Sequence, residues 1–126
     1  MYKIACLTFL MTLSVTAMAS TPLSGEQIKQ LITGNSVELH SNAQGIDFKV
    51  YFAADGSAAS HNESNGNRSK GTWRIDDSDK HCTKWGVKNE TCGQVLDMGD
   101  GSYKRMEEGY PRAVWKKIHQ GNAFGL

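Results

Sequence analysis

An excess of charge of either sign is missing from this sequence. Its 126 residues carry 14 Lys and Arg against 13 Asp and Glu, and the two signs balance when Lys3 is left out. Nucleic-acid-binding proteins need a basic surface, and anionic membranes attract polybasic segments. We therefore expect no nucleic-acid partner and no electrostatic attraction to an anionic membrane.

Long apolar runs are also missing, apart from one at the start. Residues 4–15 form a mostly apolar stretch after Lys3, and Ala-Met-Ala stands at 17–19. A basic start, a short apolar run and a small-x-small site are typical of a secretory signal peptide, whereas a membrane-spanning helix needs about 20 apolar residues. We expect residues 1–19 to be a cleaved signal peptide and residues 20–126 to be one domain without a membrane span.

Motifs for catalysis and for metal binding are absent too. The sequence has no G-x-S-x-G elbow, no H-E-x-x-H pair and no His-x-His, which are common signatures of hydrolases and metal sites. Asp76, Asp77 and Asp79 lack the ligand spacing of a calcium loop, and we interpret them as a turn, where Asp side chains bond nearby backbone. We expect no catalytic residue, no metal and no cofactor, and hence a protein that is not an enzyme.

Cysteine is scarce. Cys6 lies in the expected signal peptide, which leaves Cys82 and Cys92. An even number of cysteines in an exported chain predicts a disulfide. This bond would stabilise the fold by about 2–3 kcal/mol. A free thiol pair and half of a metal site are the alternatives, but the spacing is neither that of the redox motif C-x-x-C nor that of a zinc knuckle. We favour a structural Cys82–Cys92 disulfide.

One helix is well signalled near the start of the expected mature chain. Ser24 and Gln27 have the spacing of a capping box, and Leu23 and Ile28 stand where a hydrophobic staple would place them. Gly34 follows at the position where a glycine commonly ends a helix. We expect a short amphipathic helix between Ser24 and Gly34, lying against the mouth or side of whatever follows.

The rest of the chain predicts strands and turns. IDFKVYF at 46–52 alternates apolar and polar residues, which is typical of a half-buried strand. The polar segment 61–71 predicts a mobile loop. The strand candidates recur at intervals of about 10 residues with turn signals between them, at 36–40, 46–52, 57–60, 72–75, 81–85, 91–98, 102–107 and 113–118.

A meander of this length would leave two exposed edges unless it closed on itself. Closure is the simplest arrangement, and regular short strands are typical of an up-and-down barrel. We therefore predict a mainly β protein, a small antiparallel up-and-down barrel of about eight strands with one N-terminal helix and one disulfide.

Several segments in order resemble a family of small exported bacterial proteins, largely uncharacterised, with a lipocalin-like (calycin-like) barrel. The segments are LSGEQIKQLITGNSVEL at 23–39, VYFAADGSA at 50–58, GTWRI at 71–75 and GNAFGL at 121–126, with the two cysteines between them. Together they extend over nearly the whole expected mature chain. The resemblance implies an envelope-located β-barrel and leaves room for a ligand cavity, although barrels of this kind host many functions.

Aromatic residues on the predicted strands are the candidate ligand contacts. An eight-stranded barrel sometimes holds one small ligand, but its interior is only just wide enough for side chains. The same residues would then fill the core, which is the interpretation that we favour. The candidates are Phe48, Phe52, Trp73, Trp85, Tyr103 and Trp115.

Two functions agree with these observations, and for both we expect the protein to be periplasmic or secreted. The first is a non-enzymatic binding module for a small apolar or amphipathic ligand. The alternative is an envelope protein–protein interaction module, such as an inhibitor or an accessory subunit. A connected apolar cavity of roughly 300 Å³ or more would favour the first, and a filled interior with an exposed apolar patch would favour the second.

Overall fold

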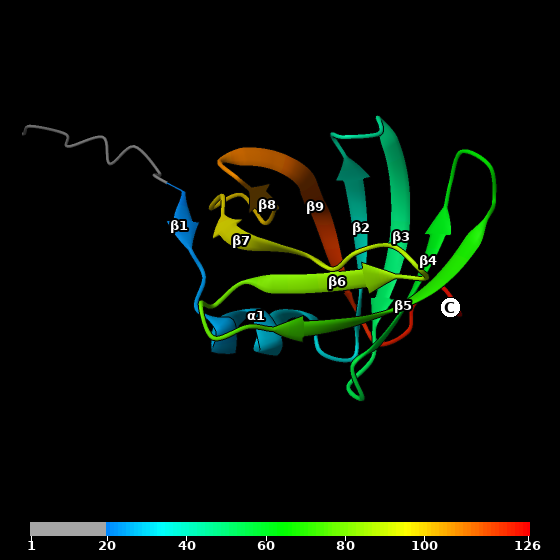
Figure 1. The fold of residues 1–126 in the computed structure, drawn as a ribbon, viewed down its shortest axis with the longest axis horizontal. Coiled ribbons are helices and arrows are strands. Elements are labelled where there is room, and N and C mark those ends of the chain that lie inside the picture. Colours follow the sequence, from blue (N-terminus) through cyan, green and yellow to red (C-terminus); the bar gives the residue numbers. More distant parts are fainter. Residues whose placement is uncertain (1–19) are drawn as a thin grey trace, which may run out of the picture.

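Eight antiparallel strands form a closed barrel in the computed structural model, which describes residues 20–126 (Figure 1). The signal peptide expected over residues 1–19 lies outside the described residues. The elements in chain order are β1 (Thr21–Pro22), α1 (Gly25–Ile32), β2 (Asn35–Ser41), β3 (Ile46–Phe52), β4 (Ser57–Asn62), β5 (Arg68–Ile75), β6 (His81–Trp85), β7 (Thr91–Asp97), β8 (Tyr103–Glu107) and β9 (Tyr110–Gln120).

The barrel is closed because its last strand, β9, pairs with β2, the first long strand. From β2 to β9, every strand pairs antiparallel with the next along the chain. β9 then pairs with β2, from Asn35↔Gln120 to Ser41↔Ala113. This arrangement removes the edges that an open meander would expose, and it confirms the predicted up-and-down barrel.

Helix α1 covers one end of the barrel, beside the point where β5 ends (Figure 1). The predicted capping box is present, because the Ser24 side chain accepts from the Gln27 amide while the Gln27 side chain accepts from the Ser24 amide. The Gly25 amide donates to Asp79 Oδ1 in the β5–β6 turn, at 2.9 Å. Ile28 is fully buried on the inner face of the helix, so the helix acts as an apolar lid over this end.

The barrel is packed solid next to this helix. Phe52 lies with its ring centroid 5.6 Å from that of Trp73 and 6.2 Å from that of Trp115. The His81 ring joins the cluster, 5.1 Å from both Phe52 and Trp115. Val95 is also fully buried in this core. The predicted core filling is therefore present in the half of the barrel that α1 covers.

The hairpin of β4 and β5 replaces most of the mobile loop expected over 61–71. β4 continues through Asn62 and β5 begins at Arg68, so that only the turn 63–67 connects them. Cross-strand pairs such as Ser60↔Ser69 and His61↔Arg68 extend the ladder. The prediction was wrong because β4 already has β3 as a neighbour, and backbone pairing inside a closed sheet overrides the weak strand propensity of polar residues.

Two further segments differ from expectation. Tyr110 and Pro111 belong to β9 and not to a turn, and the reversal lies at Glu108 and Gly109, both with positive φ. The short strand β1 was not predicted, and it pairs with the far part of β7. No helix in residues 20–126 combines the length and the apolar character needed to cross a membrane.

Candidate functional site

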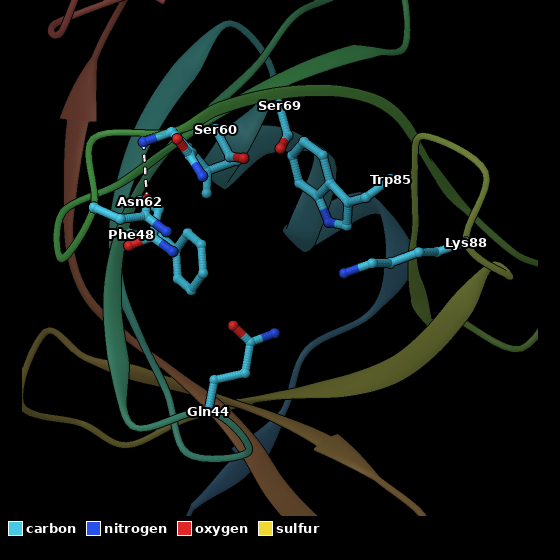
Figure 2. Close-up of a pocket in the computed structure, with 10 residues that line it drawn as sticks. Gln44, Phe48, Ser60, Asn62, Ser69, Trp85 and Lys88 are labelled. Carbon is cyan, nitrogen blue, oxygen red and sulfur yellow. Dashed lines mark hydrogen bonds between the residues drawn. The ribbon is translucent and has the colours of Figure 1, made fainter.

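A cavity of about 250 Å³ lies at the end of the barrel away from α1 (Figure 2). Turns from three hairpins surround its mouth, at 42–45, 63–67 and 86–90, and their residues at the cavity are exposed to solvent. The cavity is lined by Gln44, Phe48, Val50, Ser60, Asn62, Asn65, Asn67, Ser69, Trp85 and Lys88. The barrel is thus filled at one end and hollow at the other.

The cavity wall is continuous across neighbouring strands because inward positions alternate along each strand. Phe48 of β3 faces Asn62 of β4 in the register, and Val50 faces Ser60. Ser60 in turn faces Ser69 of β5. β3 and β4 therefore each contribute side chains at two depths, with the more buried Val50 and Ser60 below Phe48 and Asn62.

Trp85 supplies the largest apolar surface of the cavity, and Gly71 allows it to lie there. Gly71 is its cross-strand partner on β5. A Cβ built at Gly71 would come within 2.8 Å of Trp85 Cε3, which real Cβ atoms do not tolerate. The absence of a side chain at position 71 lets the indole cross the neighbouring strand.

The polar lining consists of hydroxyls and amides, with one charged group. Lys88 extends from the β6–β7 turn toward the cavity (Figure 2). No Asp or Glu lies among the described residues that line it. The backbone amide of Lys88 donates to the Trp85 carbonyl at 3.0 Å, so one tight turn positions both the charge and the indole.

The six predicted ligand contacts are divided between the cavity and the core. Phe48 and Trp85 line the cavity, whereas Phe52, Trp73 and Trp115 belong to the packed core. Tyr103 is half-buried, with its ring centroid 6.5 Å from that of Trp115. The structure therefore brings two of the six together at the hollow end.

The amides of the lining were missed because the segment 61–71 was interpreted as a mobile loop. Asn62, Asn65 and Asn67 border the cavity from this segment, and Gln44 does so from the β2–β3 turn. The alternation of Ala58, Ser60 and Asn62 was a usable signal, since all three fall on one face of a strand. Nothing local in the sequence would have identified Gln44.

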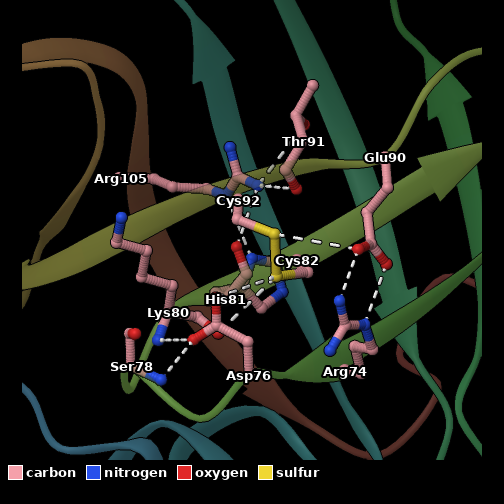
Figure 3. Close-up of polar contacts among 10 residues, drawn as sticks. All are labelled: Arg74, Asp76, Ser78, Lys80, His81, Cys82, Glu90, Thr91, Cys92 and Arg105. Carbon is pink, nitrogen blue, oxygen red and sulfur yellow. Dashed lines mark hydrogen bonds and ion pairs between the residues drawn. A yellow bond between two sulfur atoms is a disulfide. The ribbon is translucent and has the colours of Figure 1, made fainter.

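A buried polar network lies deeper in the barrel (Figure 3). Arg105 Nε donates to His81 Nδ1 at 3.0 Å, and Arg105 Nη2 donates to the carbonyls of His81 and Thr91. Arg105 Nη1 forms an ion pair with Glu107. No local pattern in the sequence predicts this network, because residues 24 positions apart meet only through the barrel.

Burial holds the pKa of His81 well below its usual value of 6.5, and the neighbouring Arg105 charge lowers it further. Burial also lowers the pKa of Arg105, against the opposing effect of its Glu107 partner. Since His81 Nδ1 accepts the Arg105 hydrogen bond, the ring is neutral with its proton on Nε2. Among the described buried side chains, Nε2 is the polar atom without a hydrogen-bond partner.

The Cys82–Cys92 disulfide is confirmed. Its sulfur atoms lie 2.05 Å apart, and the two residues face each other directly in the β6–β7 pairing. Asp76 is the third member of a group with metal-ligand atoms close together in the described chain. Because both sulfurs are bonded to each other, the group offers no thiolate to a metal.

A comparison with protein-family models and with curated proteins found no match to this chain. The resemblance to exported lipocalin-like proteins therefore stays a prediction. The fold and the chemistry of the cavity are the observations that bear on function.

Proposed function

We propose that this protein is a non-enzymatic binding module that holds a small amphipathic molecule in the hollow end of its barrel. The cavity of about 250 Å³ between Phe48 and Trp85 is the observation that carries this proposal. Small-molecule sites are typically concave, largely preformed and located at places such as the mouth of a β-barrel. A closed sheet and a packed core beneath the cavity supply a rigid scaffold for it.

The lining supports binding more than catalysis. Nucleophilic catalysis needs a base within hydrogen-bond reach of the nucleophile. Ser60 and Ser69 supply hydroxyls, but the described residues of the lining include no histidine and no carboxylate to activate them. Aromatic, amide and hydroxyl groups are the usual means of orienting a bound molecule.

The cavity is somewhat smaller and more polar than the apolar pocket that a carrier of large lipids would need. Its volume is slightly below the range of roughly 300–1,000 Å³ that is common for drug-sized ligands. Four amides and two hydroxyls stand beside Phe48, Val50 and Trp85. A ligand of one or two rings with a polar end matches this mixture.

A location outside the cytoplasm fits this role. Disulfides such as Cys82–Cys92 persist in oxidising compartments, and the apolar start of the sequence is typical of an exported chain. We therefore propose that the protein is periplasmic or secreted, like the exported lipocalin-like barrels that it resembles.

The alternative role in the envelope, an inhibitor or accessory subunit, has less support. Val87 and Tyr110 are the large apolar side chains that the described chain exposes, at 102% and 68%. Two exposed side chains fall short of the contiguous apolar patch that marks a protein interface. The experiment below distinguishes the two roles.

Titration of isotope-labelled protein with 2-naphthoate and 2-naphthamide, followed by NMR, tests the proposal. We expect at least one of these ring compounds to shift the amide signals of Phe48, Ser69 and Trp85. Because Phe48→Ala removes part of the apolar wall, it should weaken binding by about fivefold. Tyr110→Ala, an exposed aromatic outside the cavity, is the matched control and should leave the affinity unchanged.

Absence of shifts at the cavity with both compounds and with methyl β-D-glucoside would contradict the binding role. Shifts centred on Tyr110, without shifts at the cavity residues, would instead favour an exposed interaction surface.

A further inference from the structure

We propose, resting on the binding role above, that the ligand is a small anion in which a carboxylate is attached to a flat apolar ring. Three features of the cavity carry this inference: its single charged group, the direction of its amides and the placement of its aromatic rings.

The charge at the cavity is positive and uncompensated. Lys88 is the charged residue of the lining, and it has no ion-pair partner among the ion pairs of residues 20–126. Lys49 and Lys116 form ion pairs with carboxylates, and Lys88 is one of the lysines of residues 20–126 without such a partner. A cationic ligand would meet repulsion from Lys88 without a carboxylate to hold it, whereas an anion would gain a charge-assisted hydrogen bond.

The amides of the β4–β5 turn present donors to the cavity. Asn62 Oδ1 accepts from the Ser64 amide at 2.9 Å, and Asn65 Oδ1 accepts from the Asn67 amide at 2.9 Å. These contacts occupy the oxygen of each side chain and fix which end is the NH₂ group. The NH₂ groups of Asn62 and Asn65 therefore stay free to donate to a ligand acceptor such as a carboxylate oxygen.

The aromatic rings stand beside these donors. Figure 2 shows Phe48 and Trp85 on different walls of the cavity. The Lys88 side chain extends from the β6–β7 turn toward the centre of the cavity. An apolar ring could contact Phe48 and Trp85 while its carboxylate reaches Lys88. A neutral sugar would also use an indole face and amides, but it would leave the Lys88 charge without a partner.

The same naphthyl pair tests the charge of the ligand, because 2-naphthoate and 2-naphthamide differ chiefly in charge. We expect the wild-type protein to bind 2-naphthoate roughly threefold to tenfold more tightly than 2-naphthamide, as for a partly exposed charge-assisted contact. Lys88→Gln should abolish this preference by weakening 2-naphthoate binding more than 2-naphthamide binding. The preference should also shrink as ionic strength rises.

Lys84→Gln is the matched control. Lys84 is exposed on the same strand as Trp85 and precedes it, so its side chain points to the outer face of the barrel. This variant removes the same charge from the protein, and it should keep the full preference for 2-naphthoate.

The possible failures are distinguishable. If both compounds shift the cavity signals with equal affinity, or if Lys88→Gln keeps the preference, the anion inference is overturned while the binding role stands. If methyl β-D-glucoside shifts the cavity signals and neither naphthyl compound does, a neutral sugar replaces the anion. If no compound shifts them, both proposals fail.

Discussion

At the scale of single residues, the buried imidazole of His81 links the fold to pH. Its ring lies among Phe52, Trp73 and Trp115 and accepts a hydrogen bond from Arg105. A proton on Nδ1 would break that bond and place a second positive charge beside Arg105 in an apolar core. The folded barrel therefore holds His81 neutral, whereas the unfolded chain lets it titrate at its usual value of 6.5.

The barrel should lose stability as the pH falls below 6.5. Between the lowered folded pKa of His81 and 6.5, the unfolded chain binds one proton more than the folded chain. The free energy of unfolding then decreases by up to about 1.4 kcal/mol for each pH unit, and this group has no effect above 6.5. Urea unfolding at pH 7.5, 6.0 and 5.0 measures the slope.

Carboxylates with lowered pKa values, such as Asp47 and Glu90, contribute their own loss at lower pH, below about 4.5. The pH range in which they act is therefore separate from that of His81.

His81→Gln, whose side-chain oxygen can still accept from Arg105, should flatten the slope of stability against pH between pH 6.5 and 5. His61→Gln should not. A wild-type protein with constant stability from pH 7.5 to 5 would contradict this account.

At the scale of elements, α1 stabilises the barrel as a lid through one apolar face. Ile28 and Ile32 are fully buried on the face that meets the core, whereas Lys29 is exposed. The helix is short, and isolated helices of this length are marginal in water. Its stability therefore comes from packing against the strand ends and from the contact of Gly25 with Asp79.

Ile28→Ala should lower the free energy of unfolding by about 2–4 kcal/mol, because it leaves a cavity under the lid. Alanine is a better helix former than isoleucine, so any loss reports packing and not helix propensity. Lys29→Ala on the exposed face should change stability by less than about 0.5 kcal/mol. Urea unfolding followed by tryptophan fluorescence gives both values, and equal midpoints would show that α1 is not a packed lid.

At the scale of the whole molecule, β6 and β7 share the fewest paired residues of any neighbouring strands in the closed barrel. We call this pairing the β6–β7 seam. It has three paired positions, from His81↔Gly93 to Thr83↔Thr91, and β1 pairs with β7 beyond them. The Cys82–Cys92 disulfide lies at the middle pair, and Arg105 reaches the Thr91 carbonyl from β8. Gly93 allows the close approach of β8, because a Cβ there would stand 2.5 Å from the Met106 carbonyl oxygen and 3.0 Å from Arg105 Cγ.

Removal of the disulfide should open this seam first. The double variant Cys82→Ala, Cys92→Ala should lose about 2–3 kcal/mol of stability. Hydrogen exchange should accelerate in β6 and β7 more than in β2 and β3, because their short ladder has the fewest backbone pairs to protect it. Wild-type protein under reducing conditions should behave alike, and a uniform acceleration over all strands would contradict the seam.

Local patterns in the sequence were enough for much of this architecture. The capping box at Ser24 and Gln27 places the start of α1, and the alternation of 46–52 places β3 to the residue. The disulfide was predicted from Cys82 and Cys92, the two cysteines outside the expected signal peptide. The loop expected at 61–71 was wrong, and the strand β1 was missed. In both places, pairing partners distant in the sequence decide whether a polar segment becomes a strand.

The alternation of residues along each strand was enough to predict which side chains share a face of the barrel wall. How deep each side chain lies depends on the packing of the whole barrel. Phe48 and Phe52 share one face of β3, yet Phe48 borders the cavity and Phe52 is packed in the core. A two-residue period specifies a face but not a depth, and depth depends on which end of the closed barrel α1 covers. The site exists because that choice leaves the opposite end unfilled.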